Sequence, residues 1–162
     1  LTHRLRQTLA VEMNVETRLL YDVSHNIAKE EVHEIHGARC TCMVHRKGAT
    51  RAMPNQPVLV PGDRGTGSWL LEGVETNRAF SSSCHGAGRV LSRSQAKKQI
   101  DGKALKKELE SRGIRVNANT PNIMSEEAPD AYKNVDEVIE LSHKAGLAKP
   151  IARMMPLAVI KG

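Results

Sequence analysis

Aromatic residues are almost absent from this chain of 162 residues, which has one Trp, two Tyr and one Phe. It also lacks any run of about 18 apolar residues, which excludes a membrane-spanning helix of the usual length. Its three cysteines are an odd number without a framework spacing, so a disulfide scaffold is excluded and reduced thiols are expected. Residues 1–10 show no signal-peptide pattern, so the sequence predicts a cytoplasmic protein without membrane association.

Basic residues are in excess, with 24 Lys or Arg against 18 Asp or Glu and a formal net charge of +6. This balance favours polyanionic partners such as nucleic acids or nucleotides. Hydrophobic residues make up 40% of the chain and charged residues 26%, which fits one ordinary folded domain and argues against disorder along the whole chain. Because the first residue is Leu1 rather than Met, we expect a chain that begins within a longer protein, was processed, or comes from an incomplete reading frame.

The apolar pattern predicts a mixture of helices and strands without regular strand–helix–strand alternation, which indicates an α+β fold. An amphipathic helix is expected over residues 1–14, a buried strand over 19–23, and a hairpin from 31–36 and 39–45 around Gly37. We further expect strands at 58–60, 69–71 and 114–116, helices at 93–100, 103–112 and 135–144, a basic loop at 46–51, and a loop at 117–124.

Cys40 and Cys42 fall with Val44 on one face of the predicted hairpin. A Cys-x-Cys pair near several histidines could bind a metal ion. The second cysteine pair of a zinc site is missing, so an ordinary strand face is the preferred interpretation.

Two glycine-rich loops are candidates for binding phosphate. The first, Pro61–Ser68, could direct backbone N–H groups toward an anion or could simply be a turn, and it lacks the Gly-Lys-[Ser/Thr] ending of a Walker loop. The second, Ser83–Arg89, places His85 among small residues, where a neutral imidazole could attack phosphorus and Arg89 could neutralise a phosphate. A Cys84–His85 pair is the chemical alternative, although adjacent side chains of an extended chain point apart. An exposed histidine without a role is the third interpretation.

His25 follows the apolar run at 19–23 and has Asp22 and Asn26 beside it. Strand ends often carry ligands, but one histidine does not make a metal site, because a catalytic metal usually takes three protein ligands.

Six motifs occur in one order along nearly the whole chain. They are Tyr21–Ile27, His45–Arg51, Pro57–Gly62, Cys84–Arg89 with Ser92 and Arg93, Glu127–Pro129 with Ala131–Lys133, and Lys161–Gly162. Their shared order makes chance agreement implausible. Together they closely resemble the C-terminal part of the RtcB-type RNA ligases.

The resemblance implies that residues 1–162 are the C-terminal portion of a single RtcB-like catalytic domain, with mixed strands, helices packed on them, and the N-terminal part absent. It implies an RNA ligase that joins 3′-phosphate or 2′,3′-cyclic phosphate ends to 5′-hydroxyl ends in tRNA splicing or RNA repair. GTP and Mn²⁺ are the implied cofactors. RNA, as tRNA halves or broken ends, is the implied partner, with an activating helper protein as a further candidate.

The same resemblance implies roles for individual residues. His85 is expected to be the catalytic nucleophile that becomes guanylylated and passes GMP to the RNA 3′-phosphate. His25 is expected to bind Mn²⁺, with Asn26 beside the nucleotide. The nucleotide pocket is expected to contain Pro61, Gly62, Asp63, Arg64, Ser68, Gly86, Ala87 and Gly88, with Tyr132 and Lys161 holding the guanine.

The chain departs from the family pattern in two respects. The family is more than twice as long and takes its other Mn²⁺ ligands from the missing portion, so His25 alone should bind Mn²⁺ weakly. Asp63 stands where the family usually has Ser, and its carboxylate should repel phosphate oxygens unless Arg64 or a metal offsets it. Two alternatives to an RNA ligase remain at this point. One is a non-catalytic remnant with partial nucleotide or RNA binding, and the other is a basic α+β domain whose glycine loops are only turns.

Overall fold

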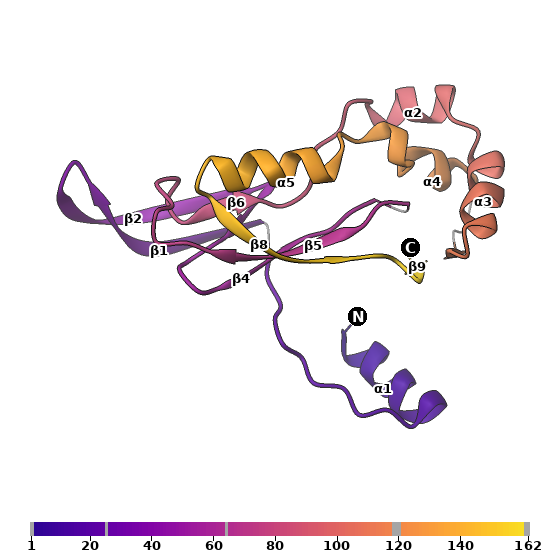
Figure 1. The fold of residues 1–162 in the computed structure, drawn as a ribbon, viewed down its shortest axis with the longest axis horizontal. Coiled ribbons are helices and arrows are strands. Elements are labelled where there is room, and N and C mark those ends of the chain that lie inside the picture. The colour runs from indigo at the N-terminus through magenta and orange to yellow at the C-terminus, as the bar shows by residue number, and fades with distance from the viewer. Residues whose placement is uncertain (1, 25, 64, 118–120, 161–162) are drawn as a thin grey trace.

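The computed structural model describes residues 2–24, 26–63, 65–117 and 121–160. These residues form a mixed α+β fold, as predicted, in which helices pack against small sheets (Figure 1). The elements, in chain order, are α1 (Thr2–Met13), β1 (Asn26–Ile35), β2 (Ala38–Lys47), β3 (Ala49–Arg51), β4 (Pro57–Val60), β5 (Ser68–Gly73), β6 (Ser82–Cys84), α2 (Arg93–Gln99), α3 (Gly102–Ser111), β7 (Arg115–Asn117), α4 (Pro121–Glu126), the 3₁₀ turn η1 (Pro129–Ala131), α5 (Val135–Lys144), β8 (Ala148–Met154) and β9 (Ala158–Ile160).

The β1–β2 hairpin confirms the predicted turn at Gly37 and extends further than the pattern suggested. The two strands pair antiparallel from Asn26 opposite Lys47 to Ile35 opposite Ala38. Gly37 has a φ of 80°, a backbone conformation that glycine adopts readily. Cys40 and Cys42 are half-buried and alternate with exposed residues, so they share one strand face as expected.

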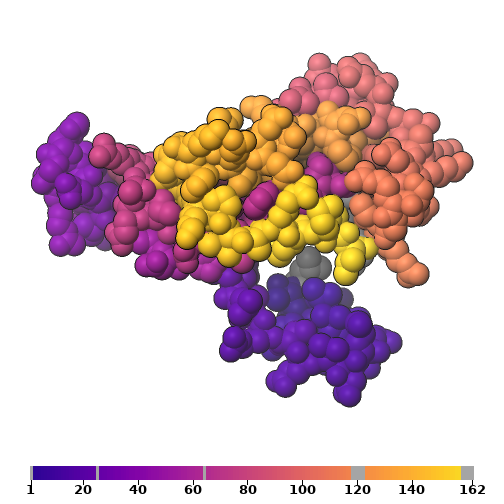
Figure 2. All heavy atoms as spheres, viewed as in Figure 1, coloured from indigo at the N-terminus to yellow at the C-terminus, as the bar shows by residue number. Residues whose placement is uncertain are grey.

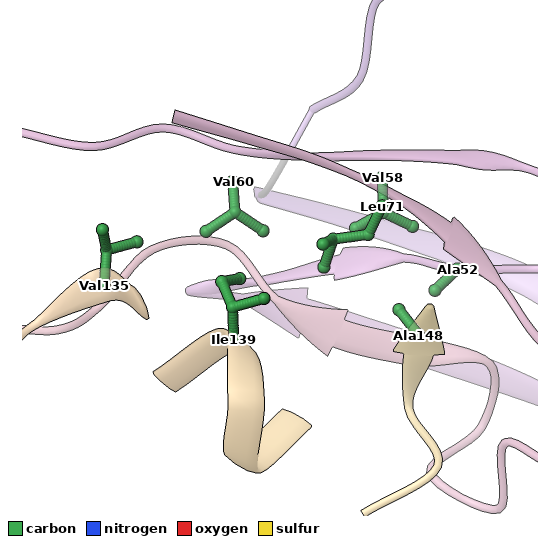
Figure 3. Close-up of a cluster of buried hydrophobic side chains, with 7 residues drawn as sticks. All are labelled: Ala52, Val58, Val60, Leu71, Val135, Ile139 and Ala148. Carbon is green, nitrogen blue, oxygen red and sulfur yellow. The ribbon is translucent and has the colours of Figure 1, made fainter. Parts of the chain in front are cut away.

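The main core lies between α5 and the antiparallel sheet β4–β5–β8 (Figure 3). Side chains of α5 point toward those of the strands, and the cluster consists of Ala52, Val58, Val60, Leu71, Val135, Ile139 and Ala148. Burying a Val, Leu or Ile side chain contributes about 1.5–3 kcal/mol. This packing therefore fixes the ends of β4 and β5, between which the first glycine-rich loop runs.

The helices α2, α3 and α4 gather at the end of the molecule away from the hairpin (Figure 1). Ser92 begins α2 with a capping box that includes Gln95, and Asp101 caps α3 by accepting from two backbone N–H groups. A second apolar cluster, Leu109, Ile114, Val116 and Met124, lies beneath these helices. The helices predicted at 93–100 and 103–112 are thereby confirmed as α2 and α3.

Three expected elements differ from the structure. Residues 19–23 do not form a buried strand, and Leu20 is 83% exposed, because no neighbouring strand pairs with this run in the described part of the chain. The predicted basic loop at 46–51 instead ends β2 and forms β3, with a bend only at Gly48. The predicted loop at 117–124 contains α4, whose first residue is Pro121, a position where proline is compatible with a helix.

The N-terminal helix α1 lies apart from the body of the molecule, and its residues form a separate lobe in the space-filling view (Figure 2). It has no buried residue, so its predicted apolar stripe covers nothing within the described structure. None of the helices in the described ranges is long and apolar enough to cross a membrane.

Candidate active site

The loop between β4 and β5 is closed by its own side chains. Ser68 Oγ accepts from the Gly62 N–H at 3.0 Å, and Thr66 Oγ1 accepts from the Asp63 N–H at 3.1 Å. Gly62 is required here, because a Cβ at this position would lie 2.2 Å from the carbonyl oxygen of Gly67. The loop is therefore a tight turn with a fixed shape.

Asp63 has a local structural role that the sequence did not indicate. Its Oδ1 accepts from the backbone N–H groups of Gly65 at 2.8 Å and Thr66 at 3.0 Å. Two amide dipoles therefore face one of the carboxylate oxygens. Part of the negative charge expected to repel phosphate is offset by the loop itself.

The second loop leaves strand β6 at Cys84, and β6 is held by pairing with β3. The thiol of Cys84 accepts from the Ser142 hydroxyl at 3.4 Å and packs against the main core. His85, the next residue, lines two cavities instead. The adjacent side chains thus point to different surroundings, and a Cys84–His85 pair is not formed.

One cavity of about 450 Å³ brings the two glycine-rich loops together. Eight of the predicted site residues line it: Pro61, Gly62, Asp63, His85, Gly86, Ala87, Gly88 and Tyr132. Sequence reasoning assigned no role to three further lining residues, Gly48, Glu127 and Val135, although Gly48 and Glu127 belong to the motifs quoted above. A second cavity, of about 360 Å³, shares Pro61 and His85 with the first and is also lined by the predicted Ser68.

Arg89 is held by three hydrogen bonds to protein groups. Its Nε donates to the Leu91 carbonyl at 2.9 Å, Nη1 to the Tyr132 hydroxyl at 2.8 Å, and Nη2 to the Glu126 carbonyl at 2.6 Å. The guanidinium also stacks 4.7 Å from the centroid of the Tyr132 ring. These contacts give Arg89 a role in holding Tyr132, and its role in neutralising a phosphate stays a prediction.

Tyr132 in turn donates from its hydroxyl to Glu127 Oε2 at 2.7 Å. Burial raises the pKa of Tyr132 above its ordinary value, and the Glu127 carboxylate raises it further, while Arg89 opposes both. The phenol therefore stays protonated at neutral pH and acts as a donor at the cavity wall.

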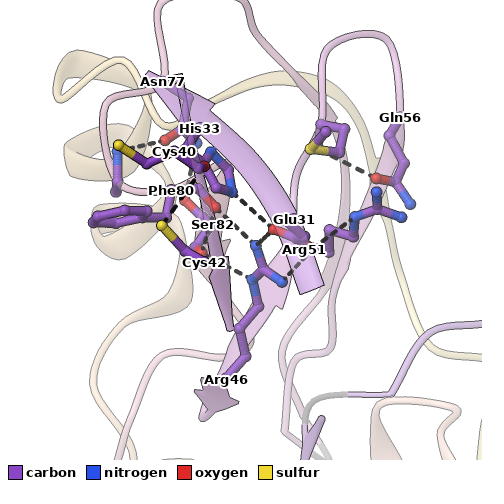
Figure 4. Close-up of polar contacts among 12 residues, drawn as sticks. Glu31, His33, Cys40, Cys42, Arg46, Arg51, Gln56, Asn77, Phe80 and Ser82 are labelled. Carbon is purple, nitrogen blue, oxygen red and sulfur yellow. Dashed lines mark hydrogen bonds and ion pairs between the residues drawn. The ribbon is translucent and has the colours of Figure 1, made fainter. Parts of the chain in front are cut away.

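A buried ionic cluster ties the hairpin to the strand that precedes His85 (Figure 4). Arg46 pairs with both carboxylate oxygens of Glu31, at 2.9 and 2.7 Å. It also donates to Ser82 Oγ at 2.9 Å and to the Phe80 carbonyl at 2.7 Å. Phe80 and Ser81 have φ values of 51° and 46°, so Arg46 braces a turn that non-glycine residues rarely adopt.

Of the remaining predicted residues, only Asn26 is described, and it does not line either of these two cavities. Asn26 begins β1 opposite Lys47, in a separate shallow hollow. His25, Arg64 and Lys161 lie outside the described residues. Among the residues that are described, no three His, Cys, Asp or Glu side chains come together in a way that could hold a metal ion.

Comparison with known proteins identifies the family. The family described as "tRNA-splicing ligase RtcB" matches residues 1–162. The chain belongs to the RtcB family. It is 48% identical over 175 residues to the "RNA-splicing ligase RtcB" of Mycobacterium tuberculosis, covering 100% of this chain and 40% of that protein. It is 48% identical over 164 residues to the "tRNA-splicing ligase RtcB" of Thermococcus kodakarensis, covering 92% of this chain and 34% of that protein.

The chain thus spans about two fifths or less of the length of these RtcB relatives. Within that span, residues of the motifs at 57–62 and 84–89 line one cavity, and Tyr132 lines the same cavity. Residues of the motifs at 57–62, 84–89 and 131–133 are therefore also neighbours in space.

Proposed function

We propose that the chain is the C-terminal portion of an RtcB-type RNA ligase and carries its guanylylated histidine. A nitrogen of His85 attacks the α-phosphorus of GTP, a P–N bond forms, pyrophosphate leaves, and the imidazole proton passes to water. An oxygen of the RNA 3′-phosphate then attacks the same phosphorus and frees His85. The 5′-hydroxyl of the second RNA end displaces GMP and forms the phosphodiester bond.

The cavity that joins His85 to both glycine-rich loops is the observation that most supports this proposal. A Cβ added at Gly86 would find only the Pro61 carbonyl oxygen, at 4.0 Å, so packing does not require glycine there. A side chain at this position would project into space beside His85 and Pro61. Glycine at 86 is therefore best explained by the close approach of a ligand.

The described residues offer a candidate pocket for GTP but no group of ligands for Mn²⁺. Tyr132 supplies a polar group and Gly86–Gly88 a backbone wall to one cavity with His85. The proposed Mn²⁺ ligand, His25, lies outside the described residues, and the described side chains contain no group of three that could bind the ion. We therefore assign Mn²⁺ to a site that needs ligands beyond these residues and derive no step through it.

We further propose that the substrates are tRNA halves or broken RNA ends in the cytoplasm, and that an activating helper protein assists turnover. The names of these relatives support splicing as the context. The excess of basic residues supports a polyanionic substrate.

The test is the intact mass of the purified chain after incubation with GTP and Mn²⁺. We expect an acid-labile, GMP-sized increase in the native chain and in His143→Ala, whose exposed histidine lies on α5, and no increase in His85→Ala. An increase that persists in His85→Ala would contradict the assignment. Saturable GTP binding by a folded native chain that gains no mass would instead support the non-catalytic remnant.

A further inference from the structure

Positive charge is concentrated in the segment that forms α2, the turn after it, and α3. Residues 93–112 contain seven Lys or Arg and three Asp or Glu, which is four of the six net positive charges of the whole chain. The segment contains no aromatic residue. Its surface is therefore cationic without a platform on which bases could stack.

Four of these seven cations have partners in the fold. Arg93 and Lys97 both face Glu126, at 3.7 and 2.6 Å. Lys106 lies 3.7 Å from Glu110. Arg112 lies 3.7 Å from Glu108 and donates to the Gly65 carbonyl at 3.1 Å.

The other three cations, Lys98, Lys103 and Lys107, are exposed and form no ion pair within the described ranges. Helical geometry places them away from the packed side of each helix. In α2, Lys98 lies two positions after the buried Ala96, on the other side of the helix. In α3, Lys103 and Lys107 lie two positions before and after Leu105, so they face away from Leu105 and Leu109. Their ammonium groups are available to an external anion.

The basic helices border the candidate active site. α2 begins eight residues after His85, and both α2 and α3 pack against α4. Leu109 of α3 and Arg112, which follows α3, also contact the loop at Gly65, which is part of the same turn as Asp63. Figure 1 shows α2, α3 and α4 together at one end of the molecule, and Glu127, directly after α4, lines the cavity.

We propose that Lys98, Lys103 and Lys107 form a cationic track that binds the phosphate backbone of the RNA substrate. The inference rests on the proposed function for the identity of the polymer. Lysines on flexible stems act as point charges, so contact with phosphates is expected to be independent of sequence. The same charges would attract an acidic protein surface, but a neighbouring site for nucleotide chemistry favours RNA.

The test is the salt dependence of binding to a fluorescent single-stranded RNA with a 3′-phosphate, measured by anisotropy from about 50 to 200 mM salt. The variant carries Lys98→Gln, Lys103→Gln and Lys107→Gln, because glutamine removes the charge and keeps the helix propensity of lysine. The matched control carries Arg39→Gln, Arg78→Gln and Lys149→Gln, three exposed cations outside this segment, and has the same net charge.

Each phosphate contact to a single strand contributes about 0.7 to the slope of log K against log salt, so loss of the track should reduce the slope by about 2. The control should keep the native slope, and both variants should melt at the native temperature. Equal slopes for the track variant and the control would overturn the proposal. So would equal loss of polyglutamate and RNA binding in the track variant, which would show a surface for any polyanion.

Guanylylation of His85 separates this inference from the function on which it rests. The track variant should gain the GMP-sized mass as the native chain does, because none of the three lysines lines the cavity. A reduced slope in the track variant, together with no guanylylation of the native chain, would support the track and contradict the proposed chemistry. Guanylylation with an unchanged slope would support the chemistry and contradict the track.

Discussion

Replacing Glu31 by Gln should destabilise the fold by breaking a buried ion pair in the hairpin. Glu31 is 6% exposed and pairs with Arg46, which is 3% exposed, while Arg51 lies 3.1 Å from its Oε1. The hydrogen bonds from Arg46 lower the pKa of Glu31 from 4.5 to about 2, against the opposing effect of burial. The substitution leaves the buried Arg46 guanidinium without a counter-charge.

The magnitude follows from the pKa. Since one pKa unit corresponds to about 1.4 kcal/mol, a change from 4.5 to about 2 corresponds to about 3 kcal/mol of folding free energy at neutral pH. This agrees with the about 3–5 kcal/mol lost when one partner of a buried ion pair is removed. Because the folded pKa lies below the unfolded value, this contribution is complete above pH 4.5 and is lost as the pH falls toward about 2.

The assay is urea unfolding of the native chain and Glu31→Gln at about pH 7 and about pH 3.5, with Glu34→Gln as control. Glu34 lies on the same strand but is exposed, so its substitution should change the free energy of unfolding by less than about 0.5 kcal/mol. Glu31→Gln should lower the free energy of unfolding relative to the native chain by about 3 kcal/mol at about pH 7. At about pH 3.5 this loss should be about 1.4 kcal/mol smaller. A difference below about 1 kcal/mol at neutral pH, or one that does not narrow in acid, would refute the reasoning.

Three further predictions concern the glycine loops and the core. Gly62→Ala should lower the free energy of unfolding by at least about 2 kcal/mol in urea titration, because its Cβ would overlap the Gly67 carbonyl. Gly86→Ala should change the free energy of unfolding by less than about 0.5 kcal/mol and should reduce guanylylation. Equal losses of stability in the two variants would contradict the different roles of these glycines. Asp63→Ala should cost about 1–2 kcal/mol in thermal unfolding by leaving two loop N–H groups unpaired, and Asp63→Asn should recover most of that loss. Ile139→Ala should cost about 2–5 kcal/mol in urea unfolding, and a loss below about 1 kcal/mol would show that this core position is not well packed.

The sequence predicted correctly those structural elements that depend only on a few neighbouring residues. Gly37 marked the hairpin, and Ser92 marked the start of α2, because a turn and a cap each depend on a few neighbouring residues. The strand expected at 19–23 failed because a strand needs a partner, and an apolar run does not reveal whether one is present. The helix α4 was missed because it falls within the loop predicted at 117–124, although Pro121 is compatible with a first helical residue.

The site was predictable as a set of residues but not as a set of contacts. The two glycine-rich loops and Tyr132 could be selected from motifs, and the cavity brings them together. The use of Arg89 to hold Tyr132 joins residues 43 positions apart, and the bond from Arg46 to Ser82 joins residues 36 positions apart. Such pairings depend on the tertiary fold, so composition and spacing carry no signal for them.

The isolation of α1 has a consequence for how the molecule responds to proteases and to exchange in heavy water. A helix of 12 residues is marginal in water without tertiary support, and α1 buries none of its residues. Its amide hydrogens should therefore exchange within seconds, while those of β5, in the middle of its sheet, remain protected. Arg18 lies in the connection that follows, which has no regular secondary structure, so trypsin should remove the N-terminal lobe there and leave the cavity and its walls intact.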